Sequence, residues 1–331
     1  MTNDGILMLT RQDVARLLPM EECIATVEHA FRLYGEGRTE APGVLGIHTP
    51  DGGFHIKAGV LPLTRLYFAA KVNGNFPANP ERHNLPTIQG VVLLADGTNG
   101  QPLALMDSME LTALRTAAAT AVAAKYLARP DSRVMTICGC GVQGVFQLRA
   151  LAKVLKLDKA YAWDTNQEKS AEFARVLTAE LGIPVVQPSD LDHALQTSDV
   201  CVTCTTSRQW FLGREHLHSG LFIAAVGADH PQKQELDPRL LSEVKVVCDV
   251  VEQCATIGDL HHALDAGLVT RSQVHAELGE VVAGKKPGRI SEEEVIVFDS
   301  TGMALQDVAA AAVVYEKAVQ EGHAAKLNFA A

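Results

Sequence analysis

The stretch RVMTICGCGVQG, residues 133–144, decides the fold of this chain. Its first half is a short apolar run that predicts a buried strand, and three glycines then interrupt the chain before a helical pattern over 143–157. Strands and helices alternate from there on: a strand over 159–163, a helix over 166–181, and strands over 183–187, 199–204, 221–226, 245–249 and 295–298. This alternation predicts βαβ units around a parallel sheet.

The three glycines, Gly139, Gly141 and Gly144, have the spacing G-x-G-x-x-G, and the flanking strand and helix supply the context that this motif needs. The first glycine permits a tight turn, the second a close approach of backbone to a pyrophosphate, and the third close packing of helix on strand. The start of the helix offers free N–H groups to phosphates. Residues 139–144, with Val142 and Gln143 included, are therefore predicted to bind a dinucleotide.

The strand after the motif ends at Asp164, which lies 25 residues after Gly139. An acid at an offset of roughly 20 residues binds the ribose hydroxyls in such domains. A carboxylate there repels a 2′-phosphate, and neither Thr165 nor Asn166 brings a positive charge, so the sequence favours NAD (NADH) over NADP. The alternative is a glycine-rich turn of an unrelated α/β domain, in which Asp164 caps the following helix.

The first part of the chain has a different pattern. A helix is predicted over 20–36, followed by strands over 44–48, 53–61, 66–73, 87–95 and 103–106 with no helix between them. Such a series predicts an antiparallel or mixed sheet. An Ala-rich helix over 109–129 ends at Pro130, and a final apolar helix over 304–320 is expected to pack back on this part or on a second subunit.

Composition excludes several classes of protein. The 331 residues are 47 % hydrophobic with a net charge of −10 and contain no basic block, which argues against a nucleic-acid partner. No apolar run of about 18 residues predicts a membrane span, and the first ten residues do not resemble a signal peptide. Of seven cysteines, four lie in apolar strands, which predicts reduced thiols and a cytoplasmic protein; the pair Cys201 and Cys204 has zinc-like spacing but no second pair, so no metal is predicted.

Several separated motifs then carry a more specific match. They are KVNGNFPANP (71–80), LPT (85–87), Gly90, LMD (105–107), LRTAA (114–118), the glycine motif, GADHPQKQELD (227–237) and DSTG (299–302). In this order, over about residues 60–315, they resemble the ornithine cyclodeaminase/mu-crystallin family.

The resemblance implies an α/β fold with a mixed-sheet α+β substrate and dimerisation domain, residues 1–117 with 307–331 packing back on it, and a Rossmann-type NAD-binding domain, residues 118–306. It also implies a homodimer. Enzymes of this family exchange a hydride between nicotinamide and the Cα of an amino or imino acid. One member of the family is a hormone-binding lens protein.

Matched residue by residue, the resemblance assigns roles. Lys71 and Arg115 correspond to the groups that bind the substrate carboxylate, a task that suits a bidentate arginine and a lysine point charge. Asp229 corresponds to the catalytic aspartate, and Lys71 is counted with it as catalytic. The remaining expected cofactor contacts are Thr116 at a phosphate, Lys233 and Ser300 at the nicotinamide, and Thr205, Ser207, Val226 and Gly227 along the groove.

Two departures from the cyclodeaminase pattern bear on the substrate. The segment APGVL (41–45) lacks the arginine found there in cyclodeaminases, and GFHIKA (53–58) places Lys57 near the position of a glutamate that binds the distal ammonium of ornithine. A lysine repels an ammonium and attracts a carboxylate. The departures argue against ornithine and favour an imino acid that is neutral or acidic on its far side.

The sequence therefore predicts an NADH-dependent imine reductase, reversible as an amino acid dehydrogenase. Iminosuccinate and cyclic ketimines such as pyrroline-2-carboxylate both remain open as substrates. The first alternative is an ornithine or lysine cyclodeaminase. The second is a non-catalytic NAD(P)H-dependent binding protein of the mu-crystallin type. The adjacent histidines His261 and His262 are expected to be structural and, as neighbours on a helix, to face apart.

Overall fold

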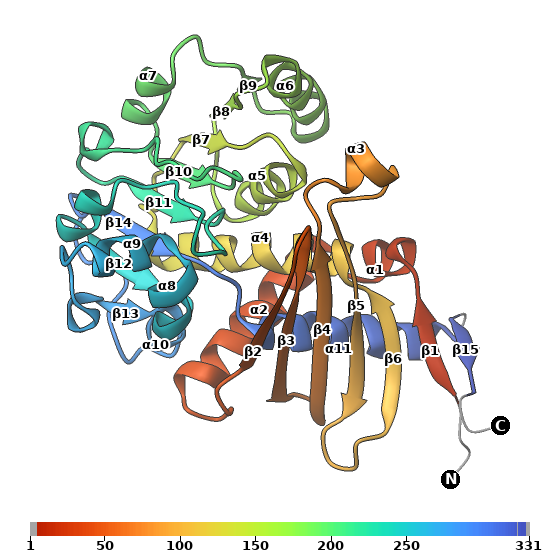
Figure 1. Cartoon of the computed structure of the whole chain (residues 1–331). Helices are drawn as coiled ribbons and strands as arrows, with labels where there is room; N and C mark the ends of the chain where they lie inside the picture. The colour runs from red at the N-terminus through yellow and green to blue at the C-terminus, as the bar shows by residue number, and fades with distance from the viewer. Residues whose placement is uncertain (1–4, 323, 329–331) are drawn as a thin grey trace. The chain divides into compact units, whose positions relative to one another are not determined.

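A computed structural model describes residues 5–322 and 324–328 and divides them into two compact units (Figure 1). Unit 1 contains the chain up to Arg115 and again from Met303, and unit 2 runs from Thr116 to Gly302. The two boundaries between the units, after residues 115 and 302, lie slightly earlier along the chain than the predicted domain limits, after residues 117 and 306. Each unit is described by itself.

Unit 1 is built on a mixed sheet, in which seven described strands lie in the order β15-β1-β6-β5-β4-β3-β2. The pair β1 and β6 is parallel and the other pairs are antiparallel, in agreement with the predicted antiparallel or mixed sheet. The strands are β1 (Ile6–Leu9), β2 (Gly43–Thr49), β3 (Gly52–Pro62), β4 (Leu66–Asn75), β5 (Ile88–Asp96), β6 (Pro102–Asp107) and β15 (Ala325–Leu327). Neither β1 nor β15 is predicted from the sequence, because each is too short to show a period.

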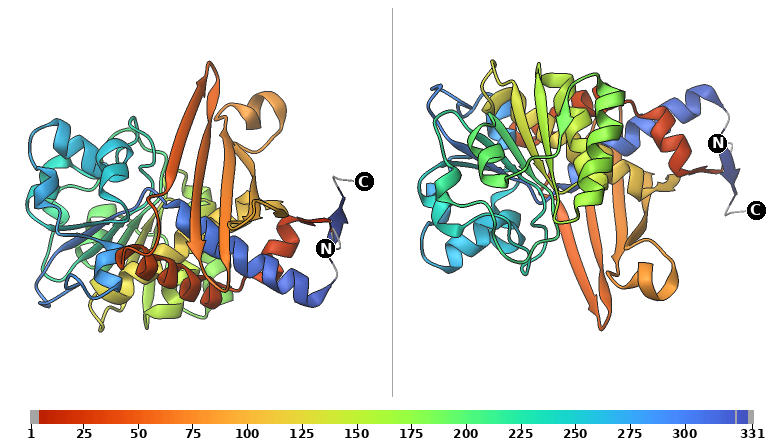
Figure 2. Two further views of the ribbon diagram at one scale, coloured as in Figure 1. Left: turned by 90° about the horizontal axis from the view of Figure 1, so that it is seen from below. Right: turned by 90° about the horizontal axis from the view of Figure 1, so that it is seen from above.

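One face of this sheet is covered by helices. The C-terminal helix α11 (Ala304–Glu321) lies against β3 and β4, and α2 (Met20–Gly35) packs on α11 (Figure 2). Alanines on α11 let its backbone approach the sheet closely. In the structure this helix belongs to unit 1. The other helical segments that contribute to this unit are α1 (Arg11–Leu17), α3 (Asn79–His83) and the first residues of α4 (Ser108–Leu127).

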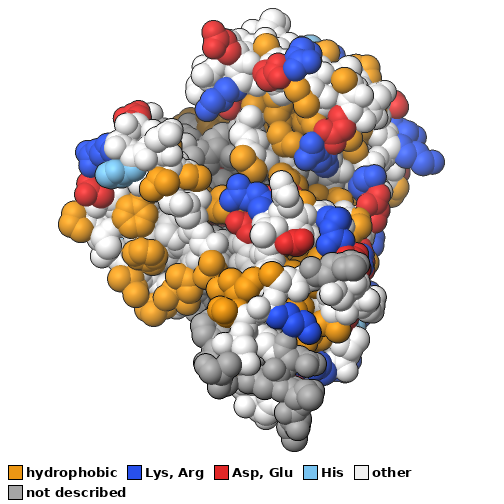
Figure 3. Space-filling model, turned by 90° about the vertical axis from the view of Figure 1, so that its right-hand side faces the viewer, with side chains coloured by type: hydrophobic (Ala, Val, Ile, Leu, Met, Phe, Trp, Pro, Cys, Tyr) orange, Lys and Arg blue, Asp and Glu red, His pale blue; other side chains and the backbone are white. Residues whose placement is uncertain are grey.

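No described helix of unit 1 covers the opposite face. The register aligns Leu45, Ile56, Val72 and Val91 across β2 to β5 on this face. Ile47 and Phe54 form the next row of the same face, because side chains two residues apart on a strand point the same way. Leu45 is 54 % exposed and Ile47 48 % exposed. Figure 3 shows hydrophobic side chains gathered on this part of the molecule.

Unit 2 is a parallel sheet in which eight described strands take the order β13-β12-β14-β11-β10-β7-β8-β9. The βαβ prediction is confirmed by this sheet. Its strands are β7 (Val134–Cys138), β8 (Lys159–Trp163), β9 (Val185–Val186), β10 (Val200–Thr203), β11 (Phe222–Ala225), β12 (Lys245–Cys248), β13 (Ala276–Glu277) and β14 (Ile296–Asp299). Its helices, besides the end of α4, are α5 (Val142–Val154), α6 (Gln167–Leu181), α7 (Leu191–Gln196), α8 (Val251–Ile257), α9 (Asp259–Asp265) and α10 (Leu278–Val282).

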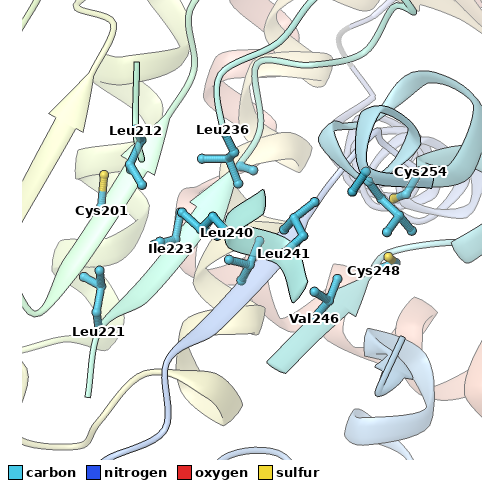
Figure 4. Close-up of a cluster of buried hydrophobic side chains, with 14 of the residues drawn as sticks. Cys201, Leu212, Leu221, Ile223, Leu236, Leu240, Leu241, Val246, Cys248 and Cys254 are labelled. Atoms are coloured by element: carbon cyan, nitrogen blue, oxygen red, sulfur yellow. The ribbon is translucent and has the colours of Figure 1, made fainter. Parts of the chain in front are cut away.

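Apolar side chains fill the space between this sheet and the segments that cover one of its faces. Figure 4 shows Ile223 of β11 together with Leu240, Leu241 and Leu236 from the segment that follows β11. These four side chains are buried. The cluster holds the segment 236–241 on the sheet and so determines where the loop before it, which carries Asp229, ends.

No described helix is both long and apolar enough to span a membrane.

Candidate active site

Three cationic side chains lie together inside unit 1. Lys57 on β3 and Lys71 on β4 are directly paired across the two strands, so both point to the face covered by α11. Arg115 reaches the same place from α4. The three residues are 9 %, 3 % and 5 % exposed. Burial of three cations close together is unfavourable unless anions accompany them.

The protein supplies one such anion, Asp307 on α11. Its oxygen Oδ1 accepts hydrogen bonds from Lys71 Nζ and from Arg115 Nε, each 2.9 Å long. The adjacent Gln306 accepts a bond of 3.0 Å from Nη1 of Arg115. Asp307 is a residue of this cluster that the sequence analysis did not predict. The sequence does contain a sign of it: Gln306 and Asp307 interrupt a helix that otherwise consists largely of alanines and valines, and polar residues in such a helix indicate a buried polar contact.

The electrostatics of this cluster favour a further anion. Burial, and next the charge of Arg115, lower the pKa of Lys71 to about 7, against the opposing effect of Asp307. Burial by itself raises the pKa of Asp307, but the charges of Arg115 and Lys71 lower it overall. Among the described residues, Arg115 Nη2 has no protein hydrogen-bond partner, nor has the buried Oδ2 of Asp307. A small carboxylate bound here would meet an arginine donor and would favour the protonated form of Lys71.

The glycine loop of unit 2 has the geometry expected of a dinucleotide cradle. Gly139 has a φ of +110°, a conformation that side chains rarely adopt, and a Cβ on Gly144 would lie 2.1 Å from the Gly139 carbonyl oxygen. A Cβ on Gly141, by contrast, would meet no atom within 4 Å. The space at Gly141, at the N-terminal end of α5, is therefore open to a ligand, and Val142 beside it is 66 % exposed. These residues fit a pyrophosphate.

Asp164 is held against the glycine loop. Its Oδ2 accepts a hydrogen bond of 2.9 Å from the Cys140 N–H and its Oδ1 one of 2.9 Å from the Asn166 N–H. The helix that follows is capped by Asn166, whose side chain accepts from the N–H groups of Glu168 and Lys169. The alternative in which Asp164 caps this helix is therefore wrong. Asp164 directly follows β8 and lies beside the glycine loop, and its role at the ribose stays a prediction.

Two further loops follow neighbouring strands at the carboxyl edge of the same sheet. Thr205 and Ser207 come after β10, and Val226, Gly227 and Asp229 come after β11. Open parallel sheets bind their ligands at this edge. Asp229 Oδ1 accepts a bond of 2.6 Å from Lys233 Nζ, which also donates to the Gly227 carbonyl at 3.2 Å. The lysine thus fixes one oxygen of the predicted catalytic aspartate.

Two residues predicted to contact the cofactor, Ser300 and Thr116, have side chains or backbone groups that are already engaged within the protein. Ser300 follows β14, but it is 3 % exposed and its hydroxyl donates to Asp249. Thr116 is half-buried on α4, where its carbonyl oxygen accepts from Thr120. Their roles at the cofactor stay predictions.

The described cysteines are all free thiols. Cys201 and Cys204, at the zinc-like spacing, have no further metal-type ligand grouped with them in the described part of the chain. The potential ligand atoms of Cys248, Cys254 and Asp299 do lie within 4.8 Å of one another. Burial raises the pKa of the Cys254 thiol well above its ordinary range, which opposes the thiolate that a metal needs. The prediction of no metal remains a prediction.

The adjacent histidines contradict the expectation that they face apart. The ring centroids of His261 and His262 are 3.8 Å apart. Each ring is held by a hydrogen bond with a backbone carbonyl oxygen. His261 Nδ1 lies 3.0 Å from the Gly258 oxygen, and His262 Nε2 lies 2.7 Å from the Lys233 oxygen.

Unit 2 combines a parallel sheet, a glycine loop and an acid after its second strand. Unit 1 adds a mixed sheet with a buried cluster of cations. Together these features are typical of a class of nicotinamide-dependent oxidoreductases. The chain matches the ornithine cyclodeaminase/mu-crystallin family over residues 5–322 and belongs to that family. The predicted family and fold class are thereby confirmed.

Three similar proteins illustrate the relation. The iminosuccinate reductase of Paracoccus denitrificans is 37 % identical over 98 % of this chain and 100 % of that protein. An archaeal alanine dehydrogenase dimer with bound NAD is 39 % identical, with a TM-score of 0.93 over 98 % of this chain and 99 % of that one. The Δ1-pyrroline-2-carboxylate reductase of Thermococcus litoralis, solved with NADH and L-proline, is 33 % identical, with a TM-score of 0.92 over 97 % and 100 % of the two chains. These relatives are oxidoreductases of amino or imino acids, and the two solved structures hold NAD or NADH, as the sequence analysis predicted for this protein.

Proposed function

We propose that this protein is an NADH-dependent imine reductase that converts a small imino acid to the L-amino acid, and that it runs in reverse as an amino acid dehydrogenase. The observation that carries the proposal is the buried cluster of Lys57, Lys71 and Arg115 with Asp307, which offers a site for a substrate carboxylate. Unit 2 supplies the glycine cradle, Asp164 and the proton donor Asp229. NADH, when bound, supplies a hydride to the Cα of the substrate.

The residues of this chain perform the remaining work. Arg115 and Lys71 bind the carboxylate and orient Cα, which removes much of the entropic cost of the reaction. Asp229 donates a proton to the imine nitrogen, directly or through water, and an iminium is more electrophilic at Cα than a neutral imine. Lys233 holds Oδ1 of Asp229 and so supports the position of the carboxyl group.

Lys57 narrows the class of substrate. A third buried cation beside the carboxylate site repels a distal ammonium and accepts a neutral or negatively charged far end. This favours iminosuccinate, with its second carboxylate, or a cyclic ketimine such as pyrroline-2-carboxylate. The same charge disfavours the cyclodeaminase reaction on ornithine or lysine. The intact set of Asp229, Lys71 and Arg115 disfavours a purely binding role, since a binding protein needs no proton donor.

The substrate is tested by following NADH oxidation with a panel of imino acids. The panel contains iminosuccinate formed from oxaloacetate and ammonia, five- and six-membered cyclic ketimines, and pyruvate with ammonia. Ornithine and lysine with NAD are assayed beside them for released ammonia. We expect turnover of an imino acid. Ammonia and a cyclic amino acid from ornithine or lysine, with no imine reduced, would establish the cyclodeaminase instead, and tight NADH binding without any turnover would establish the binding protein.

We expect the preference for NADH to depend on Asp164. In Asp164→Asn the charge that repels a 2′-phosphate is removed, while the amide oxygen can still accept one of the two backbone bonds. The ratio of kcat/KM with NADH to that with NADPH should fall by about tenfold or more, because a charge-assisted bond to the ribose is lost and a repulsion is removed. The measurement is steady-state kinetics with both cofactors, with the exposed Asp158→Asn as matched control. An unchanged ratio would show that Asp164 does not bind the ribose.

The uncovered sheet face of unit 1 is proposed as the contact between two copies of this chain in a homodimer. Leu45, Ile47, Phe54 and Val91 are each at least 40 % exposed on one face, and an apolar face of this extent is typical of an interface. A two-fold axis brings the same patch of both copies together, so one apolar face is enough to form such a contact. The dimeric state of the similar alanine dehydrogenase supports the same conclusion.

We expect Leu45→Glu combined with Ile47→Glu to yield a folded monomer. Both side chains are about half exposed in the isolated chain, so the changes add charge to the interface without entering a core. Light scattering coupled to gel filtration measures the mass, and circular dichroism checks the fold. Ile290→Glu, at the 71 % exposed Ile290 of unit 2, is the control and should leave the mass unchanged. A double variant that keeps the wild-type dimer mass would place the interface elsewhere.

The thiols bear on the compartment of the protein. Seven free cysteines, six of them buried, fit a protein that stays in a reducing compartment, and we propose the cytoplasm.

A further inference from the structure

Glu235 is a fully buried carboxylate that touches two loops of unit 2 at once. Its Oε1 accepts hydrogen bonds from the N–H of Thr205 at 2.6 Å and from the Thr205 hydroxyl at 2.7 Å. Its Oε2 accepts from the N–H of Gly227 at 2.9 Å. Thr205 follows β10 and Gly227 follows β11, and these strands are neighbours in the parallel sheet. One side chain therefore ties together the two loops that extend from the carboxyl edge.

The hydrogen bonds to Glu235 oppose the effect of burial, which favours the protonated form of an acid. Burial, and next the charge of Asp259, raise the pKa of Glu235 to about 7. Three donors aimed at its oxygens stabilise the ionised form against that effect. A buried ionised group is weak evidence for stability, because an apolar side chain of similar size could fill the same volume without desolvation. The three bonds therefore indicate a role in positioning the loops.

The backbone at Glu235 is itself anchored. The N–H groups of Glu235 and Leu236 donate to Asp259 Oδ1 at 2.9 and 3.0 Å. Asp259 begins α9, and the next N–H along, that of Leu260, donates to Asp299 at the end of β14 at 2.9 Å. A series of three buried acids thus connects the inner strand β14, through α9, to Glu235. Glu235 consequently has a fixed position from which it can hold the two loops.

The segment between Gly227 and Glu235 carries Asp229 and is closed at both ends. Gly227 N–H bonds to Glu235 at one end, and Lys233 bonds to the Gly227 carbonyl and to Asp229. A Cβ on Gly227 would lie 2.4 Å from Glu235 Oε1, so the close approach of the carboxylate requires a glycine at that position. From α9, His262 lies 2.7 Å from the Lys233 carbonyl oxygen and holds the far side of the loop. The orientation of Asp229 depends on this closure.

We propose that Glu235 is a positioning residue that sets the spacing of the 204–207 and 227–229 loops, and through them the placement of the cofactor and of Asp229. The closing of the two loops by Glu235 is a property of the chain alone, whereas its consequence for NADH and an imino acid rests on the function proposed above. Glu235 acts through Thr205 and Gly227 and needs no contact with the reacting atoms.

The first test uses the protein without cofactor. Glu235→Gln keeps the size of the side chain but turns an NH₂ group toward one of the N–H donors, so at least one of the bonds that hold the loops is lost. We expect amide hydrogen exchange at Thr205, Gly227 or both to accelerate by about tenfold or more, while exchange in β14 stays as in the wild type. Glu252→Gln, at an exposed site on α8 of the same unit, is the matched control. Unchanged exchange at both amides would overturn the proposal.

The second test measures the consequence for the cofactor. The dissociation constant for NADH, followed by the fluorescence of the bound form, should rise about tenfold in Glu235→Gln, and kcat should fall, while KM for the imino acid stays near its wild-type value. Thr205→Val, which removes one donor and leaves the carboxylate intact, should show a smaller rise. Faster exchange without weaker NADH binding would overturn the placement of the cofactor by Glu235. A wild-type protein that neither binds NADH nor reduces an imino acid would remove the proposed function, and the exchange rates would still decide whether Glu235 holds the loops.

Discussion

Asp229→Asn should lower kcat for imine reduction by about 10²- to 10⁴-fold, the range that a positioned general acid contributes. The amide has the shape of the carboxylate, and its oxygen can still accept the bond from Lys233, so the loop is kept in place. What is lost is the ability to deliver a proton to the nitrogen as the hydride reaches Cα. The measurement is the steady-state rate at saturating NADH and imino acid, with the dissociation constant for NADH determined in parallel.

A change confined to kcat separates this role from a structural one. The NADH dissociation constant and the thermal unfolding temperature of Asp229→Asn should remain near their wild-type values, because the side chain is 53 % exposed and belongs to no core. Asp265→Asn, on the exposed face of α9, is the control for removal of a charge from the same unit. A variant at Asp229 that retained a third or more of the wild-type kcat would exclude it as the proton donor.

Arg115→Ala should impair both the substrate site and the fold of unit 1. Two charge-assisted bonds to a bound carboxylate are lost, which corresponds to a fall in kcat/KM of about 10²- to 10³-fold. The change also leaves Asp307 buried with one fewer partner, and breaking a buried ion pair in this way costs about 3–5 kcal/mol. The measurements are kcat/KM for the imino acid and the free energy of unfolding in denaturant.

Two matched variants separate the effect on the substrate from the effect on stability. Arg115→Lys keeps the charge but loses the planar fork, so its kcat/KM should lie between those of the wild type and Arg115→Ala. Combining Arg115→Ala with Asp307→Asn removes the buried carboxylate that has lost one of its two cationic partners. This should restore part of the unfolding free energy but none of the substrate affinity. If Arg115→Ala lost stability while KM for the imino acid rose less than threefold, the substrate carboxylate would be bound by other residues.

Much of the fold can be predicted from local patterns. The glycine motif between a strand and a helix predicts a dinucleotide cradle from local features alone. Gly139 and Gly144 answer steric needs of a few neighbouring atoms, as the 2.1 Å approach at Gly144 shows, and Gly141 leaves space open to a ligand. The alternation of strand and helix predicts the parallel sheet for the same reason: side-chain periodicity is a property of a short segment. Short elements without a period, such as β1, β15 and β13, escape this kind of reasoning.

The substrate side was predictable only in part. Lys57, Lys71 and Arg115 can be named from motifs and from the charge that each carries, and the structure does bring them together. Their partner Asp307 lies 192 positions after Arg115 and reaches it because α11 packs against β3 and β4. A pairing across that separation leaves no periodic trace in the chain.

The sequence by itself determined the type of each unit, the cofactor class and the chemical groups available for a reaction, since these depend on residue identity and on spacing within a few turns of chain. The tertiary structure alone decided which buried charge meets which donor: Asp307 beneath Lys71 and Arg115, Glu235 between Thr205 and Gly227, and one apolar face of the first sheet left uncovered. The physical reason is that the energy of a buried charge depends on the atoms within a few ångströms of it, and only packing of distant segments determines which atoms those are.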